Sequence, residues 1–149
     1  MEISIGELRS RVGEEVGVSD WFTVTQEDVN AFAKVTRDEQ WIHVDVERAR
    51  RESPFGGPIA HGYFTLSLVS YLLSTIWTVS DASAALNYGL NRLRFPAPVL
   101  IGSRLRLRVT LNSVEDVTGG VQVNVTLTFE LEGVSKPACV AEGLFRYYA

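Results

Sequence analysis

Two segments in the second half of the chain alternate apolar and polar residues with a period of two. RLRLRVTL (residues 104–111) and VQVNVTLTFEL (121–131) place every second side chain on one apolar face, which predicts two half-buried β-strands. EDVTGG (115–120) predicts an antiparallel hairpin between them, with Gly119 and Gly120 free to adopt positive φ. A sheet built on this hairpin has an apolar face that another element must cover.

The segment GYFTLSLVSYLLSTIWTV, Gly62 to Val79, is predicted as the long helix that covers this face. It is apolar on all sides, which is typical of a helix enclosed by protein. Its length is at the short end for a bilayer span, hydroxyl side chains interrupt it, and basic residues are missing from both flanks, so we expect no membrane partner.

Two looser segments, 85–95 and 138–148, are predicted as further strands. The elements together predict an α+β chain with a hot-dog fold, in which a curved antiparallel β-sheet wraps around a long central α-helix. Other packings of a helix on a sheet contain the same elements, and periodicity does not exclude them.

The composition indicates one globular domain over residues 1–149, with 46% hydrophobic residues and no linker or repeat. The net charge of -4 argues against nucleic acid as the main partner, because phosphate neutralisation needs clustered Lys and Arg. Cys139 is the only cysteine, and the N-terminal MEISIGELRS lacks the features of a signal peptide. We therefore expect a cytoplasmic protein that acts on small molecules.

Two shorter helices are predicted in the first half. One begins after Thr25, its N-cap, and ends just before Asp38, and the other covers residues 46–52 with Asp45 as its N-cap. The connecting stretch DEQWIHVD holds His43, one of only two histidines. A histidine of near-neutral pKa and a carboxylate held close together can share the two proton transfers of a water addition or elimination.

A second motif, GGPIAHG, leads to Gly62 at the predicted start of the long helix. The first N–H groups of a helix have no partner inside it, and its positive dipole end favours negative charge. Such a position is suited to stabilise an oxyanion that develops during a reaction.

FAKVTRDEQWIHVDVERA (32–49) followed by GGPIAHGYFTLSLVS (56–70) resembles the MaoC-like hydratases, the group of the R-specific enoyl-CoA hydratases, and especially their nodulation-protein-N-like branch. The resemblance is strong over the middle third of the chain. It implies a hot-dog fold, usually a homodimer, that hydrates a trans-2-enoyl thioester or dehydrates the R-3-hydroxyacyl product. The acyl carrier is coenzyme A or acyl carrier protein, and no cofactor is implied.

Residue by residue, the resemblance implies that Asp38 and His43 hold and activate the water and that the Gly62 N–H binds the thioester carbonyl. Ser70 falls where some members have a serine that supports the site. The chain departs from the broad pattern at Arg37, where glycine is usual, and at Gln40-Trp41, where Asn-Pro is usual. Trp41 is therefore expected to shorten or reshape the acyl tunnel.

Several residues keep alternative interpretations. For His61, a structural role at the start of the long helix is favoured over proton transfer. Because the two histidines lie far apart in sequence and no Cys/His cluster is present, we expect no metal site. Ser70 either packs within its helix or supports the site. The arginines of the strands suit a solvated sheet face better than coenzyme A phosphates; they are Arg92, Arg94, Arg104, Arg106 and Arg108.

Two other functions remain compatible with these residues. A hot-dog thioesterase also directs water with a carboxylate and a helix N-terminus. In a thioesterase the water attacks the thioester carbonyl rather than C3, and such enzymes do not normally show the Asp-x₄-His spacing. A non-catalytic acyl-thioester-binding or partner subunit keeps the fold without turnover. For any of these functions the fold predicts a homodimer, because one sheet with a single helix leaves edges and part of a pocket unfinished.

Overall fold

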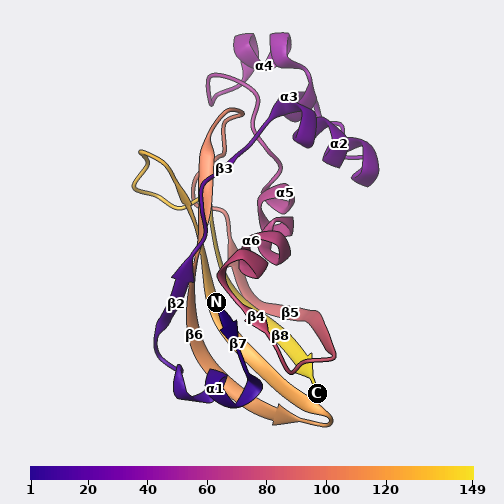
Figure 1. Ribbon diagram of the computed structural model, residues 1–149. Helices are drawn as coiled ribbons and strands as arrows, with labels where there is room; N and C mark the ends of the chain where they lie inside the picture. Colours follow the sequence, from indigo (N-terminus) through magenta and orange to yellow (C-terminus); the bar gives the residue numbers. More distant parts are fainter.

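The computed structural model describes residues 1–149 and is built around one curved antiparallel sheet (Figure 1). The sheet order is β2-β6-β7-β8-β5, and β3 also pairs with β6. The strands are β2 (Glu15–Val18), β3 (Phe22–Thr23), β5 (Ala84–Arg94), β6 (Arg104–Val117), β7 (Gly120–Leu131) and β8 (Cys139–Tyr148). This confirms all four predicted strands and the α+β class.

The hairpin between β6 and β7 lies where it was predicted, with Val117 opposite Gly120. Gly119 has a φ of 81°, as expected for a hairpin turn. Gly120 does not adopt positive φ, so that part of the prediction is wrong. Glycine is required there for another reason, because a Cβ atom would overlap the Tyr147 carbonyl oxygen of the neighbouring strand β8.

The central helix consists of α5 (Gly62–Ser67) and α6 (Val69–Ile76), joined by a turn at Leu68. The predicted end at Val79 is wrong, because Trp77 is extended and the strand β4 (Thr78–Val79) pairs in parallel with β1 (Glu2–Ile3). No helix of the structure has both the length and the apolar character needed to cross a membrane.

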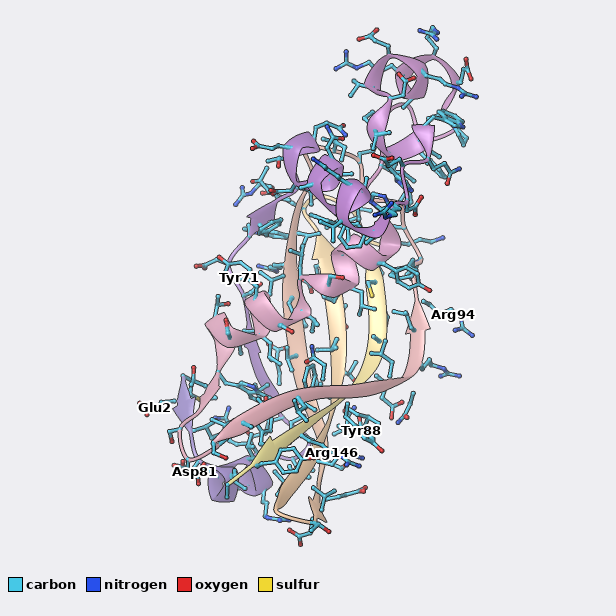
Figure 2. All side chains as sticks on the ribbon, turned by 90° about the vertical axis from the view of Figure 1, so that its right-hand side faces the viewer. Glu2, Tyr71, Asp81, Tyr88, Arg94 and Arg146 are labelled. Atoms are coloured by element: carbon cyan, nitrogen blue, oxygen red, sulfur yellow. The ribbon has the colours of Figure 1, made fainter.

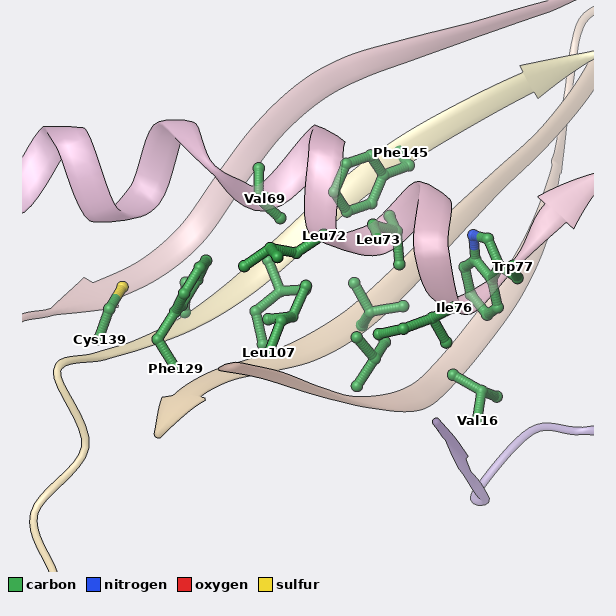
Figure 3. Packing of buried hydrophobic residues seen from close by; sticks show 14 of the residues in the cluster. Val16, Val69, Leu72, Leu73, Ile76, Trp77, Leu107, Phe129, Cys139 and Phe145 are labelled. Carbon is green, nitrogen blue, oxygen red and sulfur yellow. The ribbon is translucent and has the colours of Figure 1, made fainter. Parts of the chain in front are cut away.

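One face of the central helix packs on the concave side of the sheet. Leu72, Leu73 and Ile76 of α6 lie against Leu107 of β6 and Phe145 of β8 (Figure 3). Burial of each such aliphatic or aromatic side chain stabilises the fold by roughly 1.5–3 kcal/mol.

The opposite face of the helix is not enclosed within the chain. Tyr63 is 66% exposed and Tyr71 is 59% exposed. The prediction of a fully enclosed helix is therefore wrong for a single copy of the chain, whose one sheet covers only one side of the helix.

Three helices lie beyond the N-terminal end of α5, at one end of the sheet (Figure 1). They are α2 (Gln26–Thr36), α3 (Trp41–Val44) and α4 (Val46–Glu52), while α1 (Ile5–Ser10) lies near the opposite end. The N-caps Thr25 and Asp45 are confirmed, since their side chains accept from the N–H groups of Asp28 and Arg48. The four-residue helix α3 was not predicted, because it is too short for periodicity to show.

Candidate active site

The segment that carries Asp38 and His43 follows α2, and residues at the two ends of α2 hold it in position. Arg37 ends α2 in the left-handed conformation, with a φ of 63°, which a residue other than glycine adopts at some cost. At the other end, the Gln26 side chain donates from Nε2 to the carbonyl oxygen of His43 (2.7 Å). The loop and the short helix α3 therefore hold His43 in one place.

His43 has its ring orientation and its tautomer set by one hydrogen bond. The residue is 8% exposed, and Nδ1 lies 2.7 Å from the carbonyl oxygen of Ile59. A carbonyl oxygen only accepts, so Nδ1 carries the hydrogen and Nε2 of the neutral ring keeps a free lone pair.

Burial lowers the pKa of His43 below its usual 6.5, and the nearby His61 lowers this pKa further. The hydrogen bond to Ile59 and the negative charge of Asp38 oppose the shift without reversing it. The neutral ring, with Nε2 able to accept a proton, is therefore the dominant form at neutral pH.

His61 joins the two parts of the site. Its side chain is 3% exposed, and its ring stacks on the ring of His43, with centroids 3.8 Å apart and planes at 26°. Its Nε2 donates to the backbone carbonyl oxygen of Asp38 (2.9 Å), while Nδ1 is buried without a hydrogen-bond partner. Phe32 of α2 packs on the same ring at 5.0 Å between centroids. These contacts fit the predicted structural role.

The carboxylate of Asp38 is exposed, in contrast to the two histidine rings. One side-chain ligand atom from each of Asp38, His43 and His61 lies within 4.8 Å of the others. Two polar groups at this separation can share one bridging water.

Gly62 is the first residue of α5, and no partner inside the helix accepts from its N–H. A Cβ atom at this position would lie 2.9 Å from the ring of Phe95, the residue that follows the end of β5. The aromatic ring therefore covers the backbone at the start of the helix so closely that only glycine fits without movement.

Ser70 and Trp41 have partners that the sequence did not indicate. Ser70 Oγ accepts a hydrogen bond from Asn87 Nδ2 of β5 (3.0 Å). The Trp41 ring lies under the guanidinium of Arg48, which is 4.3 Å from the ring centroid. Neither Gln26 nor Asn87 belongs to a motif, so sequence reasoning missed both.

The strand arginines of β6 pair with carboxylates across the sheet. Arg106 and Arg108 both bond Glu130, at 2.7 and 2.8 Å, and Arg104 lies 3.3 Å from Glu132. These ion pairs favour the predicted solvated sheet face over a phosphate site.

The chain is similar to one group of known proteins, both in sequence and in fold. Residues 7–132 match the MaoC like domain. The chain is 54% identical to 3-hydroxyacyl-thioester dehydratase Z of Mycobacterium tuberculosis, over 98% of this chain and 97% of that protein. It is 44% identical to nodulation protein N of Rhizobium leguminosarum bv. viciae, over 94% and 88% of the two chains. Its fold is similar to that of an R-hydratase from Pseudomonas aeruginosa, with a TM-score of 0.75 and 22% identity over 98% and 86% of the two chains.

Proposed function

Because this chain belongs to the MaoC-like dehydratase family, we propose that it is a hydro-lyase that dehydrates R-3-hydroxyacyl thioesters and hydrates trans-2-enoyl thioesters in the reverse direction. The 54% identity to a 3-hydroxyacyl-thioester dehydratase supports the reaction class. The observation that supports the mechanism is the pair formed by Asp38 and His43, with a ring nitrogen of His43 within 4.8 Å of a carboxylate oxygen of Asp38. The acyl carrier is coenzyme A or acyl carrier protein, and the setting is the cytoplasm.

In hydration, Asp38 and His43 hold one water between them, and its oxygen attacks C3 of the enoyl group. His43 Nε2 accepts the proton that the water loses, and a proton returned by the pair reaches C2. Negative charge builds on the thioester carbonyl oxygen during the attack, and the Gly62 N–H stabilises it. No electrons are gained or lost, so the chemistry calls for no redox cofactor.

His61 and Trp41 act on the position of these groups. His61 holds the backbone of Asp38 by its hydrogen bond and supports the His43 ring by stacking. Trp41, held under Arg48, shapes the wall of the site near the start of α3.

Crotonyl-CoA and longer trans-2-enoyl-CoAs test this function directly. We expect the absorbance of the conjugated enoyl thioester to fall on mixing with the protein, with no free thiol released and with the R-3-hydroxyacyl thioester as product. Release of free thiol would instead identify a thioesterase. Binding without turnover at any chain length would identify a non-catalytic acyl-thioester-binding subunit.

We also propose a homodimer joined along β5. This edge strand is 11 residues long and carries Leu86, Tyr88 and Leu90, which are 54%, 55% and 42% exposed. Figure 2 shows Tyr88 beside Arg146 of β8, whose guanidinium lies 3.5 Å from the Tyr88 ring centroid. A long apolar edge of this kind favours pairing with another strand, and a second copy of β5 supplies one by two-fold symmetry.

Sedimentation at micromolar concentration is expected to give twice the chain mass of 16.5 kDa. The double variant Leu86→Lys, Tyr88→Lys places like charges across the two-fold axis and should shift the protein toward the monomer. Val134→Lys is the control, because Val134 is 51% exposed but lies in the loop between β7 and β8. A wild-type monomer, or equal effects of the two changes, would contradict the β5 dimer.

A further inference from the structure

The outward face of α2 carries an apolar stripe. The helix packs on the rest of the chain through Val29 and Ala33, which are buried. On the opposite face, Val35 is 82% exposed, more than any other large hydrophobic residue of the chain, and the exposed Ala31 lies one turn before it. Residues three or four apart share a face of a helix, so Ala31 and Val35 are neighbours on the outer surface of the molecule.

An apolar cavity of about 580 Å³ adjoins this stripe. α2 forms one wall and the central helix forms another, and Figure 1 shows α2 on the outer side of α5, away from the sheet. Asp28 is the one charged residue that lines the cavity, and four aromatic rings line it as well, those of Phe22, Phe32, Phe64 and Tyr71. Exposed apolar surface of this kind, with a polar rim, is typical of a protein interaction site.

The charges on the outward face are divided between the two ends of the helix. Glu27 and Asp28 lie in the first turn, and Lys34 lies in the last. None of the ion pairs of the chain includes these three residues. When two copies of such a helix run antiparallel, the acidic end of each faces the basic end of the other. The face is therefore complementary in charge to itself.

We propose that α2 pairs with α2 of a second copy of the chain, antiparallel about a two-fold axis at Ala31. The small side chain on the axis allows the two helix axes to approach to about 8–10 Å. Lys34 and Val35, three and four residues after Ala31, then lie level with Asp28 and Glu27 of the second copy, three and four residues before it. Val35 and Asp28 both lie on the side of the cavity, so Lys34 meets Glu27 on the other side.

This arrangement satisfies the apolar and the charged parts of the face together. Val35 of each copy enters the cavity of the other, and two ion pairs between Glu27 and Lys34 form beside it. Phe32, a wall of the cavity, also packs on His61 (5.0 Å between centroids), so the contact lies next to the candidate active site. The pairing uses a different surface from β5 and does not depend on the proposed reaction. A second two-fold contact of this kind joins two β5 dimers.

The contact is small, which determines when it forms. One short helix and one cavity bury less than about 1,200 Å² in total, the range of weak and transient associations. We therefore expect the β5 dimer alone at micromolar concentration and paired dimers at concentrations on the order of 0.1 mM.

Ala31→Cys tests the position of the axis. Two cysteines on the axis can approach to the Cα separation of about 4.4–6.8 Å that a disulfide needs. Oxidation with diamide should therefore link Ala31→Cys into covalent pairs roughly ten times faster than Asn30→Cys, the matched control, which is also exposed but lies beside the stripe. The native Cys139 is buried, and burial raises its pKa to about 12, so it does not compete.

Charge reversal in the Ala31→Cys background tests the register. Glu27→Lys or Lys34→Glu alone places like charges together and should slow cross-linking roughly three- to tenfold. The two changes combined restore opposite charges and should restore the rate. Glu47→Lys is the control, since Glu47 lies in the first turn of α4 and should leave the rate unchanged.

Sedimentation of the chain without an added cysteine gives a second readout. From about 1 µM to about 0.5 mM the mass of the wild type should rise, and that of Val35→Asp should not. Val134→Asp, an exposed valine in the loop between β7 and β8, should behave as the wild type. The double variant Leu86→Lys, Tyr88→Lys should still associate through α2, from monomers to dimers.

Three results would each overturn the α2 pairing. They are equal cross-linking of Ala31→Cys and Asn30→Cys, a combined charge reversal that does not restore the rate, and a wild-type mass that stays constant over the concentration range. A protein that associates in this way but turns over no enoyl thioester would refute only the proposed function.

Discussion

His43→Asn is expected to lower kcat for enoyl thioester hydration by roughly 10²–10⁴-fold, the usual contribution of a positioned acid or base. The asparagine amide can still donate to the Ile59 carbonyl oxygen, as Nδ1 does now. The asparagine offers no basic nitrogen in place of Nε2. The change therefore removes the proton acceptor and keeps the local structure.

Asp38→Asn should cause a loss of similar size, because the backbone carbonyl that binds His61 remains and only the charged carboxylate is removed. In the proposed mechanism the two groups act on the same water, and the double variant should then be little worse than either single change. Asp45→Asn is the control. Asp45 lies two residues from His43 and caps α4, and asparagine caps a helix equally well.

The pH profile separates loss of a catalytic base from loss of structure. Burial lowers the pKa of His43 below 6.5, so the ring stays neutral down to that lowered value. In the wild type, kcat/KM should hold above pH 6.5 and fall only as the pH drops through the lowered pKa. A wild-type rate that instead falls at alkaline pH, or a His43→Asn variant that retains the acid limb, would contradict this assignment.

The extended patterns of the sequence were sufficient to predict the framework. Leu105, Leu107 and Val109 alternate along β6, and each is fully buried, so the period of two holds over residues 104–111, where it was predicted. The same local patterns wrongly extended the central helix past Ile76 to Val79, although Trp77 is already extended. The last apolar residues leave the helix because Thr78 and Val79 pair with the first strand of the chain, and no local pattern reports such a distant partner.

The site was predictable only in part for a similar reason. Asp38, His43 and Gly62 belong to motifs with a defined spacing. The orientation of the side chains around them, however, depends on contacts with backbone groups. The carbonyl of Ile59 fixes His43, and that of Asp38 receives His61. Because every residue has a carbonyl, no residue type marks these two. Asn87 is likewise brought to Ser70 by the pairing of β5 with β8, which places it on the concave side opposite Phe145.

The backbone N–H of Gly62 can be removed without removing the helix. Proline is well tolerated as the first residue of a helix, where the missing N–H has no helical partner. It also requires an extended residue before it, and His61 already has φ -61° and ψ 142°. Gly62→Pro is thus compatible with the local backbone, although its Cβ atom meets the Phe95 ring.

Gly62→Ala introduces the same Cβ atom but keeps the N–H, and it is therefore the matched control. We expect kcat for Gly62→Pro to be roughly 10²–10³-fold below that of Gly62→Ala, the usual effect of losing one donor to an oxyanion. The effect of crowding against Phe95 cancels in this comparison, and Phe95→Leu should relieve it in both variants. Equal rates for the proline and alanine variants would mean that the carbonyl oxygen is stabilised elsewhere, and that Gly62 is needed only for the close approach of Phe95.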